Sequence, residues 1–156
     1  MIINQRHIAI SVDNIDKAID FYCQLGAQFM SRDLEEGPFI EHLLKLPWVK
    51  LKTCKLRLID GSRLEIMEFI EPHIKQRLIQ KFFGFNSRNI VKNGLHHIAF
   101  TVSDIESAIT IVKKHGGKIY SSPKIVTKNH STNAVLAKHA YVIDPFRNLL
   151  HIAQDL

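Results

Sequence analysis

The sequence predicts an α+β protein made of two tandem β-α-β-β-β modules, which together would form an open, cup-shaped mixed sheet with helices on its outer face. Three observations predict this fold. The segment 6–19 recurs 90 positions later as 96–109, and each copy alternates like a strand before it shows an apolar helical stripe. Each copy is then followed by further strand-like stretches. The 156 residues are enough for one compact domain.

The first copy opens with a predicted strand at residues 6–12, in which apolar and other side chains alternate. Its aliphatic side chains would face the helices, and His7 would lie on the opposite face of the sheet. Asp13 or Asn14 can cap the helix that follows. The apolar stripe of this helix consists of Ile15, Ala18, Ile19 and Tyr22. Gly26 suits the left-handed position just past the helix end.

The second copy repeats this pattern. Its strand carries three apolar side chains on one face and His97 on the other. Ser103 and Glu106 have the spacing of a capping box, and Gly116 supplies the end of the helix. His96 points away from His97 along the strand, and we expect it to have a structural or supporting role.

Each module then continues into further strands joined by turns. In the first module the strands are expected at 28–32, 49–59 and 64–70, with a loop at 35–38. In the second module they are expected at 118–121, 124–127, 135–143 and 149–154. The modules would span about 5–70 and about 95–154, with a linker helix at about 71–94, inside one domain of residues 1–156.

The composition is that of a soluble globular protein. Hydrophobic residues make up 46% and charged residues 23% of the chain, and no apolar run approaches the roughly 20 residues that span a membrane. Cys23 and Cys54 are too few for a disulfide framework, which favours a cytoplasmic location. The net charge of +6 admits a small anionic substrate. No nucleic-acid motif accompanies it, so neither nucleic acid nor a membrane is an expected partner.

Four polar side chains are expected on the sheet face turned away from the helices. They are His7, Glu65, His97 and His151. His7 and His97 are 90 positions apart, and Glu65 and His151 are 86 apart in an alignment of the two module ends. A pseudo-twofold axis between the modules would gather all four in the cup. The histidines off this pattern are expected on the surface or in loops: His42, His73, His115, His130 and His139.

Three imidazoles and one carboxylate are a typical donor set for Zn, Ni, Fe, Co or Mn, whereas Mg and Ca prefer oxygen ligands. The sequence therefore predicts one divalent metal ion bound by His7, Glu65, His97 and His151. Four protein ligands would leave positions open for two adjacent oxygens of a substrate. Neither cysteine falls at a ligand position.

The motifs that carry these residues resemble those of the vicinal oxygen chelate superfamily. That superfamily includes glyoxalase I, methylmalonyl-CoA epimerase, extradiol dioxygenases, fosfomycin-resistance thiol transferases and bleomycin-resistance binding proteins. The matching segments are 7–13, 64–68, 94–102 and 144–152. The resemblance extends over nearly the whole chain, and it implies the fold described above, a divalent metal and a homodimer.

The resemblance carries the roles of metal ligands onto His7, Glu65 and His97. The family usually has a glutamate in the last strand, which binds the metal and has a proposed role as base in glyoxalases and the epimerase. Here His151 stands at that position. A histidine can still bind a metal, so the departure affects the expected reaction more than the expected metal.

The residues and the resemblance together predict an enzyme that stabilises an enolate of a small anionic substrate, as a glyoxalase-like lyase or an epimerase does. Glu65 is the expected catalytic base because it is the only carboxylate of the set, with His151 and the loop residue Glu41 as alternatives. Two other functions stay open: an Fe(II) extradiol-type dioxygenase, and a metal-free ligand-binding or resistance protein. A basic row on one strand could attract the anion: Lys50, Lys52, Lys55 and Arg57.

Overall fold

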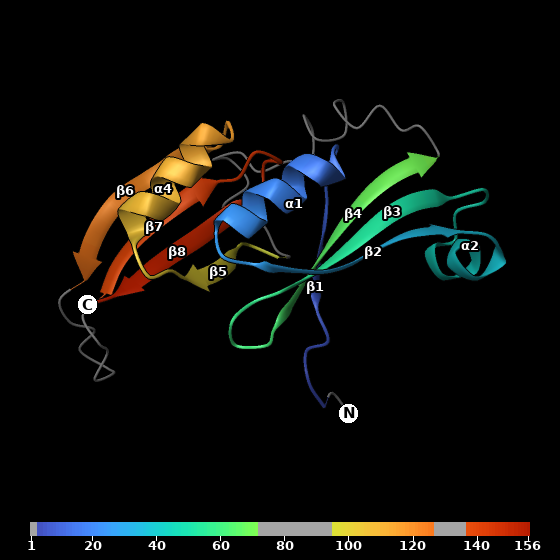
Figure 1. Ribbon diagram of the computed structural model, residues 1–156, viewed down its shortest axis with the longest axis horizontal. Helices are drawn as coiled ribbons and strands as arrows, with labels where there is room; N and C mark the ends of the chain where they lie inside the picture. Colours follow the sequence, from blue (N-terminus) through green and yellow to red (C-terminus); the bar gives the residue numbers. More distant parts are fainter. Residues whose placement is uncertain (1–2, 72–94, 127–136) are drawn as a thin grey trace. The chain divides into compact units, whose positions relative to one another are not determined.

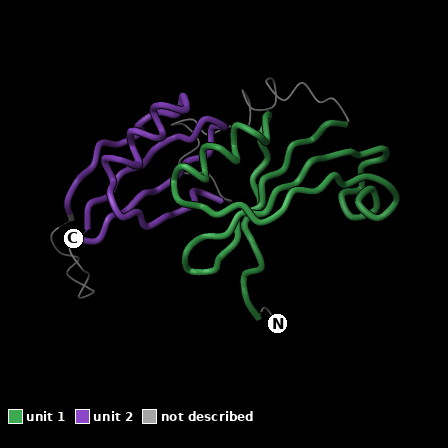
Figure 2. The backbone as a smooth tube through the Cα atoms, viewed as in Figure 1, with its two compact units in different colours: residues 1–79 green, residues 80–156 purple. Residues whose placement is uncertain are grey.

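The computed structural model describes residues 3–71, 95–126 and 137–156. The chain divides into two compact units, Met1–Ile79 and Gln80–Leu156, which are coloured green and purple in Figure 2. We call them unit 1 and unit 2 and describe each by itself. Within the described ranges, no helix combines the length and the apolar character needed to cross a membrane.

In its described residues, unit 1 is a four-stranded mixed sheet with two helices (Figure 1). Its elements are β1 (Ile8–Ser11), α1 (Ile15–Gln24), β2 (Gln28–Glu36), α2 (Pro38–Leu44), β3 (Lys50–Arg57) and β4 (Arg63–Glu71). The strands lie in the order β1-β4-β3-β2. β1 runs parallel to β4, and the other two pairings are antiparallel.

Unit 2 repeats this topology. Its elements are β5 (Ile98–Thr101), α4 (Ile105–Lys114), β6 (Lys118–Val126), β7 (Ala137–Ile143) and β8 (Leu149–Asp155). The strand order is β5-β8-β7-β6, again with one parallel pair, β5 and β8. The predicted pair of β-α-β-β-β modules and the open mixed sheets are therefore confirmed within the units, while the cup formed by both sheets together stays a prediction.

The structure differs from the predicted elements in two places. β2 extends to Glu36, and α2 follows where a loop was expected. Gly37 turns the chain with a φ of 95°, Pro38 occupies the first turn of α2, and the buried side chain of Ile40 holds this helix on the sheet. In unit 2 the two expected strands at 118–121 and 124–127 form one strand, β6, with an irregular register against β7. The predicted linker helix lies outside the described residues.

The two long helices begin in the same way. The side chain of Asn14 accepts a hydrogen bond from the backbone N–H of Lys17 at 2.9 Å, and Asp104 accepts one from Ser107 at 2.6 Å. The expected capping box starting at Ser103 is therefore wrong, because the cap is one residue later, at the position that matches Asn14. Both predicted helix-ending glycines do have positive φ angles, at Gly26 and Gly116.

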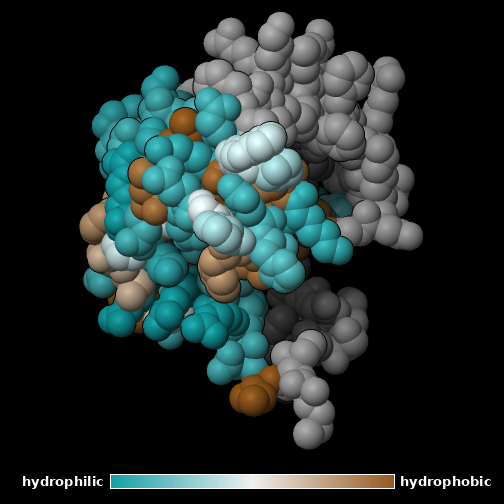
Figure 3. All heavy atoms as spheres, turned by 90° about the vertical axis from the view of Figure 1, so that its right-hand side faces the viewer, coloured by the Kyte–Doolittle hydropathy of each residue, from teal (hydrophilic) through white to brown (hydrophobic). Residues whose placement is uncertain are grey.

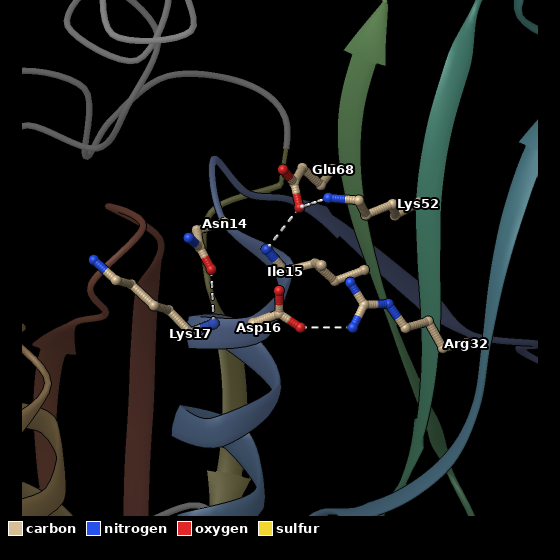
Figure 4. A network of polar contacts seen from close by, with 7 residues as sticks. All are labelled: Asn14, Ile15, Asp16, Lys17, Arg32, Lys52 and Glu68. Atoms are coloured by element: carbon tan, nitrogen blue, oxygen red, sulfur yellow. Dashed lines mark hydrogen bonds and ion pairs between the residues drawn. The ribbon is translucent and has the colours of Figure 1, made fainter.

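A second anchor ties each helix to the last strand of its own unit. In unit 1 the carboxylate of Glu68 accepts a hydrogen bond from the N–H of Ile15 at 3.0 Å and lies 3.4 Å from the ammonium of Lys52 (Figure 4). In unit 2 the side-chain oxygen of Gln154 accepts from the N–H of Ile105, also at 3.0 Å. The start of each helix is thus fixed against the sheet.

The main core of each unit lies between its long helix and one face of its sheet, and in unit 1 a second buried cluster joins Ile40 of α2 to Val49 and Leu51. In unit 1 this layer contains Ile10, Val12, Ile15, Ala18, Phe21, Leu56, Leu64 and Ile66. In unit 2 it contains Ile98, Ile105, Ala108, Val112, Val142, Leu150 and Ile152. The side of unit 1 turned toward the viewer in Figure 3 is mostly hydrophilic, with hydrophobic side chains in small separate groups.

Candidate functional site

Glu65 lies on the face of the unit 1 sheet that α1 does not cover. Its neighbours Leu64 and Ile66 are buried in the core, and strand alternation turns Glu65 to the opposite side. The register places Ala9 of β1 and Lys55 of β3 directly beside it. Residues paired in this way point to the same face, so Lys55 shares the surface of Glu65.

His7 joins Glu65 on this face, as the sequence predicts. It directly precedes β1, and its Nε2 lies 3.3 Å from Oε2 of Glu65. The carboxylate is the more enclosed partner, with 13% of its side chain exposed against 37% for the imidazole. The structure therefore brings together the two members of the predicted set that belong to unit 1.

The other two members meet in unit 2. The rings of His97 and His151 lie edge to face, with centroids 5.6 Å apart and planes at 80°. His151 pairs in register with Ala99 of β5, in the position that Glu65 has beside Ala9. The equivalence of Glu65 and His151, which rests on an alignment of the module ends, thus holds in the strand register as well.

The structure adds a histidine that the sequence pattern missed. His139 on β7 faces the same side as His151, and its Nδ1 lies 2.9 Å from Nε2 of His151. Its expected place on the surface or in a loop is wrong. The signal was present, because Ala140 and Val142 are the apolar members of an alternating strand that leaves His139 on the other face.

Tyr141 is the second residue that the pattern missed. It lies directly opposite His151 in the register, and the two rings stack with centroids 4.9 Å apart and planes at 19°. Its ring also meets His97 edge to face at 5.3 Å. His151 is therefore held between aromatic neighbours on its own sheet face.

His96 contacts His97 rather than standing apart from it. The two Nδ1 atoms are 2.8 Å apart, which is a hydrogen-bond distance. A neutral imidazole has one N–H and one lone pair, so one ring must donate here and the other accept. When His97 donates from Nδ1, its Nε2 keeps a lone pair that can bind a metal.

The environment of the two unit 2 histidines favours their neutral form. Burial lowers the pKa of His97, and the neighbouring His96 lowers it further. Burial also lowers the pKa of His151, with smaller contributions from His139 and His97. Neutral imidazole is the form that binds metals, so these shifts suit the predicted role.

The donor chemistry fits a divalent transition metal, because imidazole and carboxylate groups meet in pairs on the expected faces. Across residues 3–71, 95–126 and 137–156, no group of three or more histidine, cysteine, aspartate and glutamate side chains is arranged to hold an ion. Each unit by itself thus supplies two of the four predicted ligands. The convergence of His7, Glu65, His97 and His151 on one ion stays a prediction.

The basic row of β3 does not lie on one face. Lys52 pairs in register with Glu68 and contacts that helix anchor, so it points to the α1 side. Lys50 forms an ion pair with Glu36 at 2.7 Å. Lys55 lies directly beside Glu65, and strand alternation puts Arg57 on the same face.

The alternative base Glu41 has a structural partner. It lies in α2 rather than in a loop, and its Oε1 accepts a hydrogen bond from the backbone N–H of Trp48 at 3.0 Å. Of the remaining histidines, His42 is exposed on α2 and His115 caps the end of α4. His73 and His130 lie outside the described residues.

Neither cysteine lies on the sheet face that carries the candidate ligands. Cys54 is buried on the core side of β3, where burial and the nearby Cys23 raise its pKa to about 11. Burial and Asp20 raise the pKa of Cys23 as well. Both are protonated thiols near neutral pH, which makes them poor metal ligands.

The fold and the strand faces that carry these polar pairs define a class of protein. A model of the Glyoxalase/Bleomycin resistance protein/Dioxygenase superfamily matches residues 6–134. Since this match covers most of the chain, the protein belongs to that superfamily, the vicinal oxygen chelate proteins.

Particular proteins are similar to this chain. Methylmalonyl-CoA epimerase, mitochondrial, from Homo sapiens is 31% identical over 109 residues, which are 69% of this chain and 51% of that protein. The chain thus spans about half the length of this curated relative. A glyoxalase family protein from Bacillus cereus superposes with a TM-score of 0.77 at 20% identity, over 100% of this chain and 96% of its own. A glyoxalase I mutant from Zea mays has a TM-score of 0.60 at 16% identity, over 95% of this chain and 44% of its own.

Proposed function

We propose that this protein is a metal-dependent isomerase or lyase that moves a proton at the carbon beside a carbonyl group of a small anionic substrate. An epimerase of an acyl-CoA ester is the first form to test. The observation that carries this choice is the 31% identity over 109 residues with human methylmalonyl-CoA epimerase. The polar pairs on the two sheet faces supply side chains suited to the task.

In this proposal His7, Glu65, His97 and His151 bind one divalent ion, of Zn, Ni, Fe, Co or Mn. When bound, the ion would supply a Lewis acid for two adjacent oxygens of the substrate. The remaining chemistry belongs to side chains of this protein. Lys55, beside Glu65 on the same face, would attract the negative charge of the substrate.

Glu65 is the proposed base, because it is the only carboxylate among the four residues. It would take the proton from the substrate carbon onto a carboxylate oxygen, and the electron pair left behind would move into the carbonyl group. His7, whose Nε2 is 3.3 Å from Oε2, would hold this carboxylate in place. Epimerisation requires a proton to return to the opposite side of the carbon, and water from the solvent would supply it.

Proton exchange in D2O tests this function directly. The protein is loaded with each of the five metals in turn and incubated with methylmalonyl-CoA, and deuterium uptake at the substrate carbon is followed by mass spectrometry. We expect uptake by the wild type and a loss of roughly 100-fold or more in Glu65→Gln, the range for removal of a general base. Metal content is measured in both proteins, so that loss of the base is separated from loss of the ion.

His42→Ala is the matched control, because this histidine is exposed on α2 and belongs to no polar pair described above. It should exchange protons as fast as the wild type. Full turnover by Glu65→Gln with its metal retained would eliminate Glu65 as the base. If the wild type exchanges no proton with any metal, the epimerase form is wrong. Turnover of a glutathione hemithioacetal in the same preparation would then indicate the lyase form.

A further inference from the structure

The hydrogen bond between His139 and His151 joins two neighbouring strands on one face of unit 2. It links Nδ1 of His139 on β7 to Nε2 of His151 on β8 at 2.9 Å. Both side chains are half-buried, and Tyr141 stacks on the ring of His151. Neighbouring side chains on the sheet face therefore enclose this hydrogen bond.

A neutral imidazole has one N–H and one lone pair, so only two directions are possible for this bond. If His139 donates, His151 carries its own proton on Nδ1 and its lone pair on Nε2 is used up. His151 then has no lone pair for a metal, and Nε2 of His139 is free instead. If His151 donates from Nε2, its Nδ1 keeps a free lone pair.

We propose that His139 is a positioning residue for His151: its Nδ1 accepts the Nε2–H of His151 and leaves the Nδ1 lone pair of His151 to bind the divalent metal. This inference rests on the proposed function and deepens it. The free lone pair belongs on His151 because this ring contacts His97, the other proposed ligand of unit 2. His139 lies two residues before Tyr141 on β7, where it pairs with Ala153 rather than with His151.

Unit 1 shows why such a partner is needed in unit 2. The position of His151 is taken there by Glu65, and the position of His139 by Thr53, according to the register of each hairpin. The hydroxyl of Thr53 donates to Glu35 rather than to Glu65. A carboxylate has lone pairs on both oxygens in any orientation, whereas an imidazole binds a metal only in the correct tautomer. The histidine at 151 thus requires a group that fixes its proton.

His97 provides a second example of the same arrangement. Its Nδ1 is 2.8 Å from Nδ1 of His96, which leaves Nε2 available. Each proposed imidazole ligand of unit 2 is therefore hydrogen-bonded to another histidine. Such partners hold a ligand ring in place and fix its tautomer, and their removal typically weakens metal binding by roughly 10–100-fold.

The direction of the bond is tested on the metal-free wild type. At mildly alkaline pH, 15N chemical shifts of the histidine rings distinguish a protonated ring nitrogen from one with a lone pair. We expect the proton of His151 on Nε2, and a mixture of tautomers at His151 in His139→Ala. A proton on Nδ1 of His151 in the wild type would overturn the inference and would point to His139 as the ligand.

The effect on metal binding is measured by titration with Co(II), followed by its absorption spectrum and by the shift in Tm. We expect His139→Ala to bind roughly 10–100-fold more weakly than the wild type. His139→Asn should recover most of the affinity, because its amide oxygen can accept near the former Nδ1 position. His42→Ala serves as the control and should bind as the wild type does.

Equal Co(II) affinity in the wild type and His139→Ala would refute the positioning role while leaving the proposed function intact. A wild type that binds no Co(II) would contradict the proposed function instead. In that case the ring spectra of the metal-free protein would still decide the direction of the hydrogen bond. The His139→Asn variant keeps the comparison possible if His139→Ala does not fold.

Discussion

The carboxylate of Glu68 offers a quantitative test of how each helix is fixed to its sheet. It accepts the N–H of Ile15, in the first turn of α1, and contacts Lys52 at 3.4 Å (Figure 4). A hydrogen bond to a charged acceptor contributes about 1.5–3 kcal/mol. The ion pair adds at most about 0.5 kcal/mol, because the side chains of Lys52 and Glu68 are 34% and 20% exposed.

We therefore expect Glu68→Ala to lower the free energy of unfolding by about 2–3 kcal/mol, which corresponds to a fall in Tm of roughly 5–10 °C for a chain of this size. Glu68→Gln should cost only about 1 kcal/mol, because an amide oxygen can still accept from Ile15. Unit 2 provides the precedent, since Gln154 binds the N–H of Ile105 at the same 3.0 Å distance. Gln154→Ala should cost about 1 kcal/mol, the value for a neutral hydrogen bond.

Urea denaturation of the metal-free protein, followed by circular dichroism, measures all three variants under one condition. Glu36→Ala is the control, because the side chain of Glu36 forms an exposed ion pair with Lys50 and should change stability by less than about 0.5 kcal/mol. The reasoning is refuted if Glu68→Ala unfolds at the same urea concentration as the wild type. It is also refuted if Glu68→Gln is as unstable as Glu68→Ala.

Two further predictions concern packing and pH. A Cβ at Gly117 would lie 2.6 Å from the carbonyl oxygen of Ile143 and 2.7 Å from Cγ1 of Val112, so Gly117→Ala should cost about 1–3 kcal/mol in thermal unfolding. Ala27→Gly, at the equivalent position of unit 1, should cost no more than about 1 kcal/mol, and equal losses would contradict this account. The second prediction follows from the lowered pKa values of His97 and His151. As the pH falls, the two histidines are protonated first in the unfolded chain, near the ordinary histidine pKa of about 6.5. The free energy of unfolding should therefore be highest above that pH, decrease below it, and become constant below the lowered pKa of the folded state. Urea titrations of the metal-free protein between mildly alkaline and mildly acidic pH measure how the free energy of unfolding changes with pH. His151→Gln should make this change smaller, and a wild-type stability that does not depend on pH would contradict the prediction.

The repeat predicted the strands and long helices well because the periodicity of apolar side chains is a local property of the sequence. The α2 helix was missed because it is short and Ile40 is its one fully buried residue, so it shows no apolar stripe. His139 was missed for another reason. Thr53 stands at the equivalent position of unit 1, so the repeat does not mark this place with a pair of ligand residues.

The pairs His7–Glu65 and His97–His151 could be predicted because alternation assigns each residue to a sheet face and the short parallel pairing brings the strands together. Hydrogen bonds between ring nitrogens could not, because they depend on side-chain rotamers and on neighbours across the sheet. The meeting of all four residues at one ion stays a prediction. It depends on residues far apart in the sequence, which no local periodicity specifies.

One of the two inner strands of each sheet carries functional side chains on one face and helix contacts on the other. β4 carries Glu65 on one face and the helix anchor Glu68 on the other, and β8 carries His151 and Gln154 in the same way. A spacing of three residues along a strand always separates two side chains onto opposite faces. The side chain on one face can therefore differ between the units, Glu65 in one and His151 in the other, while the opposite face still holds the start of a helix through Glu68 or Gln154.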